Sequence, residues 1–99
     1  MTKIHFEAPS PEDYCNLRAN AGMSSKSIEA AIKGLPHACF NVTLYENDML
    51  IGMGRVIGDG GTVFQIVDIA VKDIYQGLGH GMAIMHEIMK DRKSTRLNS

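Results

Sequence analysis

Gln76-Gly77-Leu78-Gly79-His80-Gly81 is the stretch that decides how this 99-residue chain folds. It lies between a strand-like run at 67–71 and a helix-like run at 82–90. Glycines at alternate positions, where a helix begins, remove the side chains that would keep a ligand away from the first backbone N–H groups. Those groups have no partner inside the helix and lie at the positive end of its dipole. The stretch therefore predicts a cradle for a diphosphate group.

Two better-known phosphate-binding motifs fit this stretch poorly. The P-loop requires Lys and then Ser or Thr after its last glycine, whereas Met82 and Ala83 follow here. The dinucleotide fingerprint requires G-x-G-x-x-G directly after the first strand of a β-α-β unit. Here the spacing is G-x-G-x-G, and four residues separate it from the strand. On spacing alone, a glycine loop without a ligand is as good an interpretation as a phosphate site.

The segments before the cradle predict two helices. Ser10 is expected to cap the first helix, and Gly22 suits its end. Ser24 or Ser25 is expected to cap the second helix, which Gly34 helps to close. Apolar residues recur at helical spacing in this second helix and predict its buried face: Ile28, Ala31, Ile32 and Leu35.

From residue 38 the apolar period changes from 3.6 to 2, as expected at the start of a half-buried strand. Turn-forming clusters then divide the chain into three strands at 38–45, 49–57 and 62–71. These strands predict an antiparallel meander, and a further short strand is expected at 4–6. Gly52 and Gly54 interrupt the middle strand, which indicates a bulge, a close backbone approach or a loosely packed strand.

The last predicted helix follows the cradle and spans residues 82–90. Three methionines line one flank of it, and we interpret them as filler for the core: Met82, Met85 and Met89. Residues 91–99 are polar and basic and have no apolar period. We expect this tail to be disordered, and it resembles a translated sequencing-adapter read-through rather than native sequence.

Composition limits the possible functions. The chain is 44% hydrophobic and 21% charged with a net charge of −1, which gives no electrostatic reason to expect binding to nucleic acid or to an acidic membrane. Its apolar runs are far shorter than a membrane span, and its first residues lack the apolar stretch of a signal peptide. A cytoplasmic protein is therefore expected.

The cysteines and histidines do not predict a metal site. Cys15 and Cys39 lack the C-x-x-C pattern, and we expect them to be buried free thiols. His80 and His86 are six residues apart, which on a helix turns them about 240° from each other. Two side chains on such different faces cannot bind one metal ion.

The cradle and its surroundings resemble the acetyl-CoA-binding motif of the GNAT superfamily of N-acetyltransferases. That motif has Gln or Arg, two further residues, Gly, one residue, and then Gly or Ala, and Gln76, Gly79 and Gly81 occupy those places. The resemblance covers residues 4–90. It implies, for residues 1–90, an incomplete GNAT fold of the α/β (α+β) class. Its elements are an N-terminal strand, two helices, an antiparallel three-strand meander and the cofactor-binding helix.

By this resemblance the cofactor is acetyl-CoA, with CoA as the product. The cradle is expected to hold the diphosphate, and the strand before it to hydrogen-bond the pantetheine arm. The implied cofactor-binding residues are Ile69, Ala70, Val71, Gln76, Gly77, Leu78, Gly79, His80 and Gly81. Gln76 is expected to bond a phosphate oxygen or, alternatively, to hold the loop. His80 is expected to contribute its backbone N–H, with its ring at the surface.

The resemblance assigns no catalytic residue. The family fold continues with a fifth strand, a fourth helix and a closing hairpin, which this sequence does not encode. The acid that protonates the leaving thiolate is often a tyrosine of that fourth helix, and Tyr75 does not correspond to it. Asp68 is the only carboxylate on the predicted strand at 62–71. It is a candidate base, although a structural hydrogen-bond partner is the favoured interpretation.

The implied activity of the parent enzyme is transfer of an acetyl group to an amine of a small molecule or peptide. In this family the acceptor pocket draws on the first two helices, here residues 14–35. The alternative is a truncated, non-catalytic fragment that at most binds CoA weakly. Without a fifth strand, the strand at 67–71 has an open apolar edge, which predicts aggregation or self-association.

Overall fold

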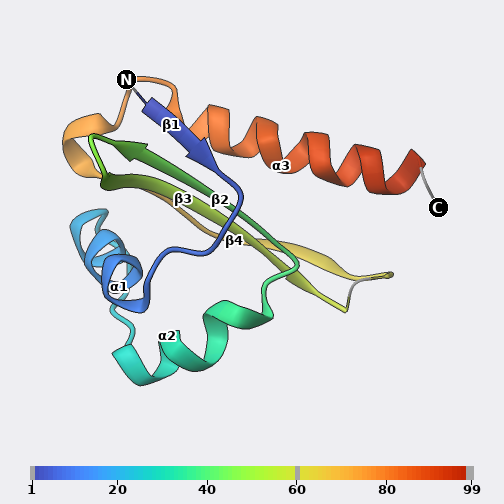
Figure 1. Ribbon diagram of the computed structural model, residues 1–99, viewed down its shortest axis with the longest axis horizontal. Coiled ribbons are helices and arrows are strands. Elements are labelled where there is room, and N and C mark those ends of the chain that lie inside the picture. Colours follow the sequence, from blue (N-terminus) through green and yellow to red (C-terminus); the bar gives the residue numbers. More distant parts are fainter. Residues whose placement is uncertain (1, 60, 98–99) are drawn as a thin grey trace.

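The computed structural model describes the backbone of residues 2–59 and 61–97 and the side chains of residues 2–59 and 61–91. The elements follow in the order β1 (Thr2–His5), α1 (Pro11–Asn20), α2 (Ile28–Gly34), η1 (Leu35–His37), β2 (Phe40–Glu46), β3 (Met49–Gly58), β4 (Phe64–Val71), η2 (Asp73–Tyr75) and α3 (His80–Leu97). They form the expected α/β fold, a four-stranded sheet with helices on both of its faces (Figure 1).

The sheet is antiparallel throughout and has the order β1-β2-β3-β4. The predicted meander is therefore confirmed, and the short N-terminal strand joins it at β2, where Ile4 pairs with Leu44. On the other side β4 forms the edge of the sheet, as expected. Self-association through that edge stays a prediction.

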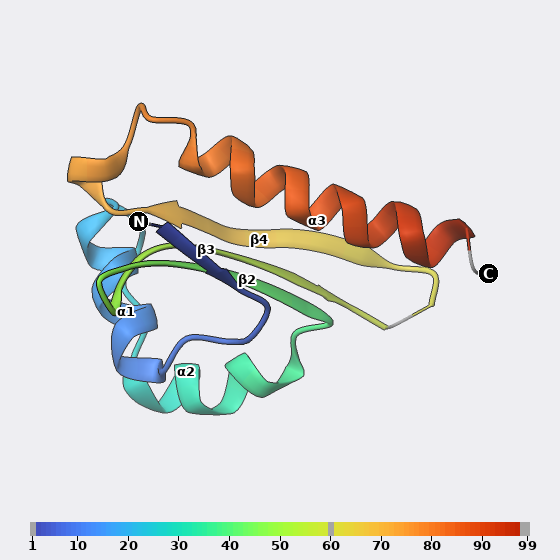
Figure 2. The same cartoon turned by 45° about the horizontal axis from the view of Figure 1, so that its top comes forward.

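Helices cover both faces of the sheet. α1 and α2 lie on one face, and α3 crosses the opposite face (Figures 1 and 2). As a result Val42, Thr43 and Leu44 of β2 are all buried, so the prediction that this strand is half-buried is wrong. The polar Thr43 gave the strand its alternating pattern. Its hydroxyl lies 3.3 Å from the carbonyl oxygens of both His5 and Glu7, so it is buried with acceptors in reach.

α3 packs directly on the two glycines of β3. A Cβ atom at Gly54 would lie 2.5 Å from Cγ2 of Ile84, and one at Gly52 would lie 3.2 Å from Cδ1 of the same residue. Ile84 and Ile88 are fully buried in this contact. Of the interpretations left open for Gly52 and Gly54, close backbone approach is confirmed at both glycines, and a bulge is confirmed at Gly54, where the register with β4 shifts between Met53 and Arg55. A loosely packed strand is wrong.

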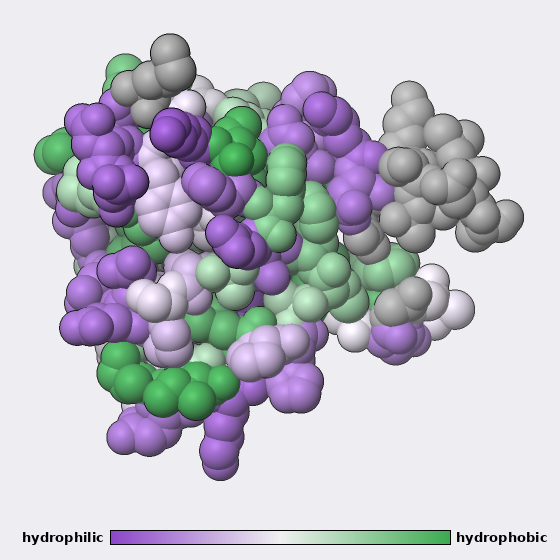
Figure 3. All heavy atoms as spheres, viewed as in Figure 1, coloured by the Kyte–Doolittle hydropathy of each residue, from purple (hydrophilic) through white to green (hydrophobic). Residues whose placement is uncertain are grey.

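α2 differs from its prediction at its start and on its apolar face. Its cap is Ser27, whose hydroxyl accepts a hydrogen bond from the amide of Ala30 at 3.1 Å, and not Ser24 or Ser25. Ile28 and Ile32 are 43% and 56% exposed, whereas Ala31 and Leu35 of the same predicted face are buried. Because the helix is short and begins late, only one edge of that face reaches the core. An apolar strip is accordingly visible where α2 lies, at the lower edge of Figure 3.

α3 differs in its methionines and in its length. Met82 and Met89 are 76% and 50% exposed, so the prediction that the methionine stripe fills the core is wrong for them; the two isoleucines fill it instead. The helix also continues to Leu97, past residue 90, where we expected order to end. No glycine or proline between 91 and 97 interrupts it. The non-native origin of residues 91–99 stays a prediction, and residues 98–99 lie outside the described chain.

Candidate functional site

The turn that leads into α3 has the backbone geometry of an anion cradle. The first hydrogen bond of the helix runs from the amide of Ala83 to the carbonyl of Gly79 at 3.0 Å. The amides of His80, Gly81 and Met82 therefore precede the helix's own hydrogen-bond ladder. Gly79 stands just before them and has no side chain with which to cap them. These three donors lie at the positive end of the helix dipole, where a phosphate is favoured.

The glycines of the cradle serve two different purposes. Gly77 and Gly79 have φ angles of +82° and +87°, which L residues with side chains rarely adopt, so glycine is needed there for the turn. Gly81 is not in that region, and a Cβ atom placed on it would lie 4.0 Å from Cγ2 of Val71. At Gly81 the missing side chain leaves room over the helix start rather than permitting an unusual backbone.

A hollow of about 320 Å³ lies over this turn. Its lining consists of Val71, Tyr75, Gln76, Gly77, Gly79, His80, Gly81 and Met82. At roughly 30 Å³ per water, this volume corresponds to about ten water molecules, which is enough for a diphosphate. Leu78 of the predicted site is 68% exposed and does not line the hollow.

Two side chains of the cradle have contacts of their own. The side-chain amide of Gln76 donates to the carbonyl oxygen of Val71 at 2.8 Å, so it holds the loop against the end of β4, as in the alternative interpretation. The ring of His80 is half-buried and meets the ring of Tyr75 edge-on, with 6.0 Å between centroids. The ring, which we expected at the surface, is therefore only partly exposed, and Tyr75 in η2 lies against it.

The last residues of β4 lie beside the hollow. Ala70 is buried and pairs with Met53 of β3, whereas Ile69 and Val71 are half-buried on the side of α3. The strand has β3 as its only neighbour in the sheet formed by the described residues. On the other edge of β4, the main-chain groups of residues 69–71 thus have no partner strand among the described residues, and this edge leads to the cradle.

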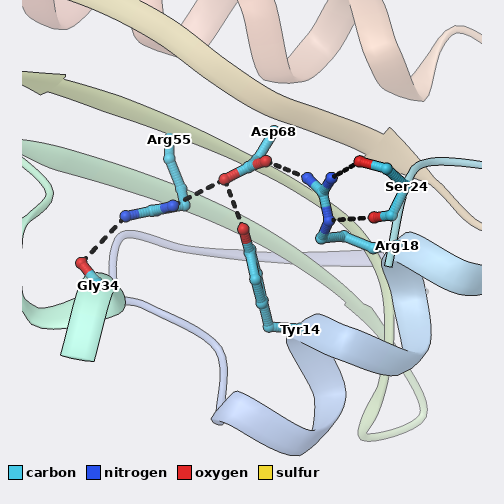
Figure 4. A network of polar contacts seen from close by, with 6 residues as sticks. All are labelled: Tyr14, Arg18, Ser24, Gly34, Arg55 and Asp68. Carbon is cyan, nitrogen blue, oxygen red and sulfur yellow. Dashed lines mark hydrogen bonds and ion pairs between the residues drawn. The ribbon is translucent and has the colours of Figure 1, made fainter. Parts of the chain in front are cut away.

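A β-bulge in β4 sets the direction of Asp68. Met53 pairs with Ala70 and Arg55 pairs with Val67, so β4 has one more residue than β3 between these two pairs. Asp68 lies in the extra segment, with a φ angle of +57° in the left-handed region. The bulge aims its side chain at the helices on the face opposite α3 (Figure 4).

Three side chains converge on the Asp68 carboxylate. The hydroxyl of Tyr14 in α1 donates to Oδ2 at 2.8 Å, and Arg55 in β3 donates to the same oxygen at 2.7 Å. Arg18, one turn after Tyr14 in α1, forms an ion pair with Oδ1. The Asp68 side chain is only 11% exposed, so these contacts are shielded from water. The carboxylate is thus already occupied on both oxygens.

The two arginines also tie down the neighbouring segments. Arg18 donates to the carbonyl and to the hydroxyl oxygen of Ser24, both at 3.0 Å, and Arg55 donates to the carbonyl of Gly34 at 3.1 Å (Figure 4). The first contact fixes the loop between α1 and α2, and the second fixes the end of α2. Asp68 is therefore the centre of a network that holds both helices on the sheet.

The electrostatics of the network favour a structural function for Asp68. Burial and the hydrogen bond to Asp68 raise the pKa of Tyr14, so the tyrosine is a neutral donor. A general base must have a free oxygen within reach of the proton that it removes. Both oxygens of Asp68 already accept hydrogen bonds from cations or from Tyr14, so the favoured interpretation, a structural partner, agrees with these contacts.

Sequence reasoning missed the residues that surround Asp68. Tyr14 and Arg18 are four apart on α1, so they share one face of the helix. Arg55 is two residues from the buried Met53, so alternation along β3 directs both side chains to the same side. These two signals place each residue on a face, but neither identifies a partner 54 residues away along the chain.

The remaining candidate residues are the cysteines and the possible metal ligands. Cys15 and Cys39 are both free thiols, as expected. Cys15 is half-buried, but Cys39 is exposed, so its expected burial is wrong. Among the residues that the structure describes, no three His, Cys, Asp or Glu side chains gather as a possible metal site. No helix in that same part of the chain is long and apolar enough to cross a membrane.

Known proteins share this architecture. No family model matches the sequence. One similar crystal structure is that of a protein of unknown function from methicillin-resistant Staphylococcus aureus, described as a probable acetyltransferase. Its sequence is 65% identical to this chain, and the two structures match with a TM-score of 0.92. The match covers 95% of this chain and 71% of that one. A GNAT family acetyltransferase from Streptococcus pneumoniae is 26% identical with a TM-score of 0.80, over 94% of this chain and 69% of that one. The chain belongs to the GNAT family of acetyltransferases.

Two further comparisons concern a curated relative and a structure with the same fold. An uncharacterized ycf52-like N-acetyltransferase of Prochlorococcus marinus is 30% identical over 81 residues, 78% of this chain. The GNAT chain described here spans 45% of the length of that curated relative. A GNAT family acetyltransferase from Brucella melitensis was solved in complex with acetyl-CoA. It is 15% identical to this chain with a TM-score of 0.61, and the match covers 94% of this chain and 70% of that one. At this identity the comparison shows a shared fold alone.

Proposed function

We propose that this chain forms the acetyl-CoA-binding part of an N-acetyltransferase. In the complete enzyme, the cradle between β4 and α3 holds the diphosphate of acetyl-CoA, and the free edge of β4 at Ile69, Ala70 and Val71 binds the pantetheine arm. The acceptor is an amine of a small molecule or peptide. The amine attacks the thioester in its neutral form, so a proton must leave it before or during the attack.

The observation that carries this proposal is the helix start at Gly79. Three successive amides lie before the first intrahelical bond, an open hollow lies over them, and three of the residues that line this hollow are glycines. Membership in the GNAT family and a neighbour of the same fold with bound acetyl-CoA support the choice of cofactor. A second possibility is that the chain alone binds CoA weakly and has no activity, which the open edge of β4 favours.

Ligand-dependent melting tests the cradle. A ligand that binds the folded state raises the thermal midpoint by mass action. We expect CoA to raise the midpoint, whereas pantetheine, which lacks the diphosphate, has a much smaller effect at equal concentration. In ¹H–¹⁵N spectra, CoA should shift the amide signals of His80, Gly81 and Met82 most. Equal effects of CoA and pantetheine would contradict a diphosphate site.

A substitution at Gly81 tests how a negative charge in the hollow affects CoA binding while α3 stays folded. Gly81→Glu places a carboxylate in the hollow at a position with room for a Cβ atom and an ordinary backbone. An acidic residue in the first turn stabilises a helix by roughly 0.3–1 kcal/mol, so loss of CoA binding cannot be ascribed to loss of α3. We expect Gly81→Glu to abolish the CoA-dependent shift. The isosteric Gly81→Gln is the control for bulk and should retain part of it.

A further inference from the structure

A second cavity lies on the opposite face of the sheet from α3. It has a volume of about 190 Å³ between α1, α2 and β3. Its lining consists of Tyr14, Lys26, Ala30, Ala31, Gly34, Leu35 and Arg55. The lining combines aliphatic groups, which are the small side chains of α2 and Leu35, with Tyr14 and two cations. No carboxylate lines it.

The surroundings of this cavity carry an excess of positive charge. Arg18 and Arg55 share the single carboxylate of Asp68, so the buried network has one uncompensated cation. Among the described residues, no carboxylate lies within salt-bridge distance of the exposed Lys26, which adds a second cation. A buried charge needs compensation more than an exposed one, because the low dielectric around it strengthens every Coulomb interaction.

Arg55 also has N–H donors that are not engaged in hydrogen bonds. A guanidinium offers five N–H donors, and the contacts of Arg55 engage it with Asp68 and Gly34 only. Its Nε is buried and has no hydrogen-bond partner. Buried donors without partners are uncommon in folded proteins. Arg55 thus borders the cavity with an incompletely satisfied, incompletely neutralised guanidinium.

We propose that this cavity binds the carboxylate of the acceptor, so that the amine acetylated by this protein is a small amino acid or a similar amino carboxylate. Lys26 and Arg55 supply the charge, and the wall of Ala30 and Leu35 packs against a short aliphatic chain. The cavity has room for about six waters, which limits the bound group to a short chain. Naming the ligand as the acceptor rests on the proposed function, whereas carboxylate binding in this cavity does not.

The position of the cavity relative to the cradle supports this assignment. Arg55 lines the cavity and contacts Asp68, and Asp68 lies one residue before the segment of β4 expected to bind the pantetheine arm. A ligand in the cavity therefore approaches β4 from the face opposite α3. An amine that is held by its carboxylate at Arg55 would extend toward the same strand that the thioester approaches.

Two matched probes test the site in the full chain. 4-Aminobutyrate carries the amine and the carboxylate, and n-propylamine is the same amine without the carboxylate. We expect 4-aminobutyrate to shift the ¹H–¹⁵N amide signals of Ala30, Ala31 and Gly34, and n-propylamine at equal concentration to leave them unchanged. Equal shifts with both probes, or no shift with 4-aminobutyrate, would overturn the proposal.

Three variants at exposed positions locate the charge. Lys26→Glu reverses one cation and Ala30→Glu introduces an anion, and each should weaken 4-aminobutyrate binding by at least about tenfold. Lys33→Glu makes the same charge change on α2 away from the cavity, and its effect should be within about twofold because solvent and salt screen it. If Lys33→Glu matches Lys26→Glu, the attraction is merely general and the proposed site is wrong.

A measurement of CoA binding distinguishes a failure of the carboxylate site from a failure of the proposed function. The CoA-dependent shift of the amides of His80 and Gly81 should be the same in Lys26→Glu as in the unchanged protein. If CoA binds but 4-aminobutyrate does not, the carboxylate site is wrong and the proposed function stands. If 4-aminobutyrate binds in the cavity but CoA does not bind the cradle, the site is retained and its assignment to an acetyl acceptor is wrong.

Discussion

The two faces of the sheet are joined to their helices by different chemistry. On one face, α3 lies directly on Gly52 and Gly54, and the cluster between them is apolar: Val42, Leu44, Ile51, Val56, Ile84 and Ile88. On the other face, α1 and α2 also pack on an apolar cluster, which consists of Tyr14, Leu17, Ala31, Leu35, Leu50, Met53 and Ala70. These helices are linked to the sheet in addition through Asp68 and two arginines, beside the smaller cavity. Apolar packing alone thus positions the helix that begins the cradle, whereas apolar packing and ion pairs together position the helices around the proposed acceptor site.

This difference has consequences for how each face tolerates change. An apolar contact without voids is stiff, because every added or removed methyl group must be accommodated by its neighbours. A buried charge network is held by partners that depend on one another, so removal of one member leaves the others uncompensated. Both faces are therefore expected to be sensitive to changes of side-chain volume, and the α1 face is in addition expected to be sensitive to charge.

The largest effect is expected from Asp68→Asn. The substitution keeps the shape of the side chain and is compatible with a φ angle of +57°, because asparagine tolerates the left-handed region. It leaves two buried arginines without their carboxylate, which should lower the free energy of unfolding by about 3 to 5 kcal/mol. Urea denaturation measures this change. Asp73→Asn, at the exposed start of η2, is the matched control, and an equal loss there would refute the idea of a central carboxylate.

Gly54→Ala tests the opposite face. The added Cβ atom would lie 2.5 Å from Cγ2 of Ile84, so the helix or the strand must move. Overpacking of this kind costs about 1 to 3 kcal/mol, and we expect about 2 kcal/mol in urea denaturation. Gly34→Ala is the control, because its Cβ atom would meet nothing within 4 Å and its backbone is helical. It should be neutral or slightly stabilising. A similar loss at both glycines would show that the contact with Ile84 is not the cause, and a negligible loss in Gly54→Ala would show that α3 has freedom to adjust.

The sequence predicted the order of elements because their signals are local. Ser10 does cap α1, with its hydroxyl accepting a hydrogen bond from the amide of Asp13 at 3.1 Å, and the glycine clusters do mark the turns. The motif at Gln76 also lies where predicted, between β4 and α3. Caps, turns and periods depend on neighbours within a few residues, so a single sequence contains them.

The features that were wrongly predicted or missed depend on contacts between residues that are far apart in the sequence. The exposure of Ile28 and of Met82 could not be read from periodicity, which indicates an apolar face but not whether anything covers it. The network around Asp68 joins residues 50 and 54 positions apart, and no local signal pairs them. The glycines of the middle strand did indicate a bulge, but the β4 residue whose side chain it redirects, Asp68, follows only from the register between β3 and β4.

Tyr14→Phe tests the weaker, neutral member of the network. Loss of a hydrogen bond to a charged group should cost about 1.5 kcal/mol, less than the loss of the carboxylate itself. The raised pKa of Tyr14 adds a pH signature. The unfolded state ionises first, so the tyrosine's contribution is complete below pH 10 and is lost as the pH rises toward the folded-state pKa. Stability in alkaline buffers measures it. An unchanged slope above pH 10 in Tyr14→Phe would contradict this assignment.

The smallest effect concerns a carboxylate that is satisfied without cations. Asp59, in the exposed turn between β3 and β4, accepts hydrogen bonds from the amides of Gly61, Val63 and Thr62 and from the hydroxyl of Thr62. These donors, the Gly61 amide first, hold the pKa of Asp59 well below its usual range. Its stabilising effect is therefore present above pH 3.8 and is lost only as the pH falls through the depressed pKa.

A titration of the Asp59 carboxyl carbon by ¹³C NMR distinguishes the two kinds of carboxylate. Thr62→Val removes one donor and leaves the three amides, so the midpoint should move upward by a fraction of its total displacement while the overall stability hardly changes. The reason is exposure, because water replaces a lost hydrogen bond at the surface but cannot do so beside Asp68. A large loss of stability in Thr62→Val would mean that the hairpin turn, and not only the buried network, holds β4 in register.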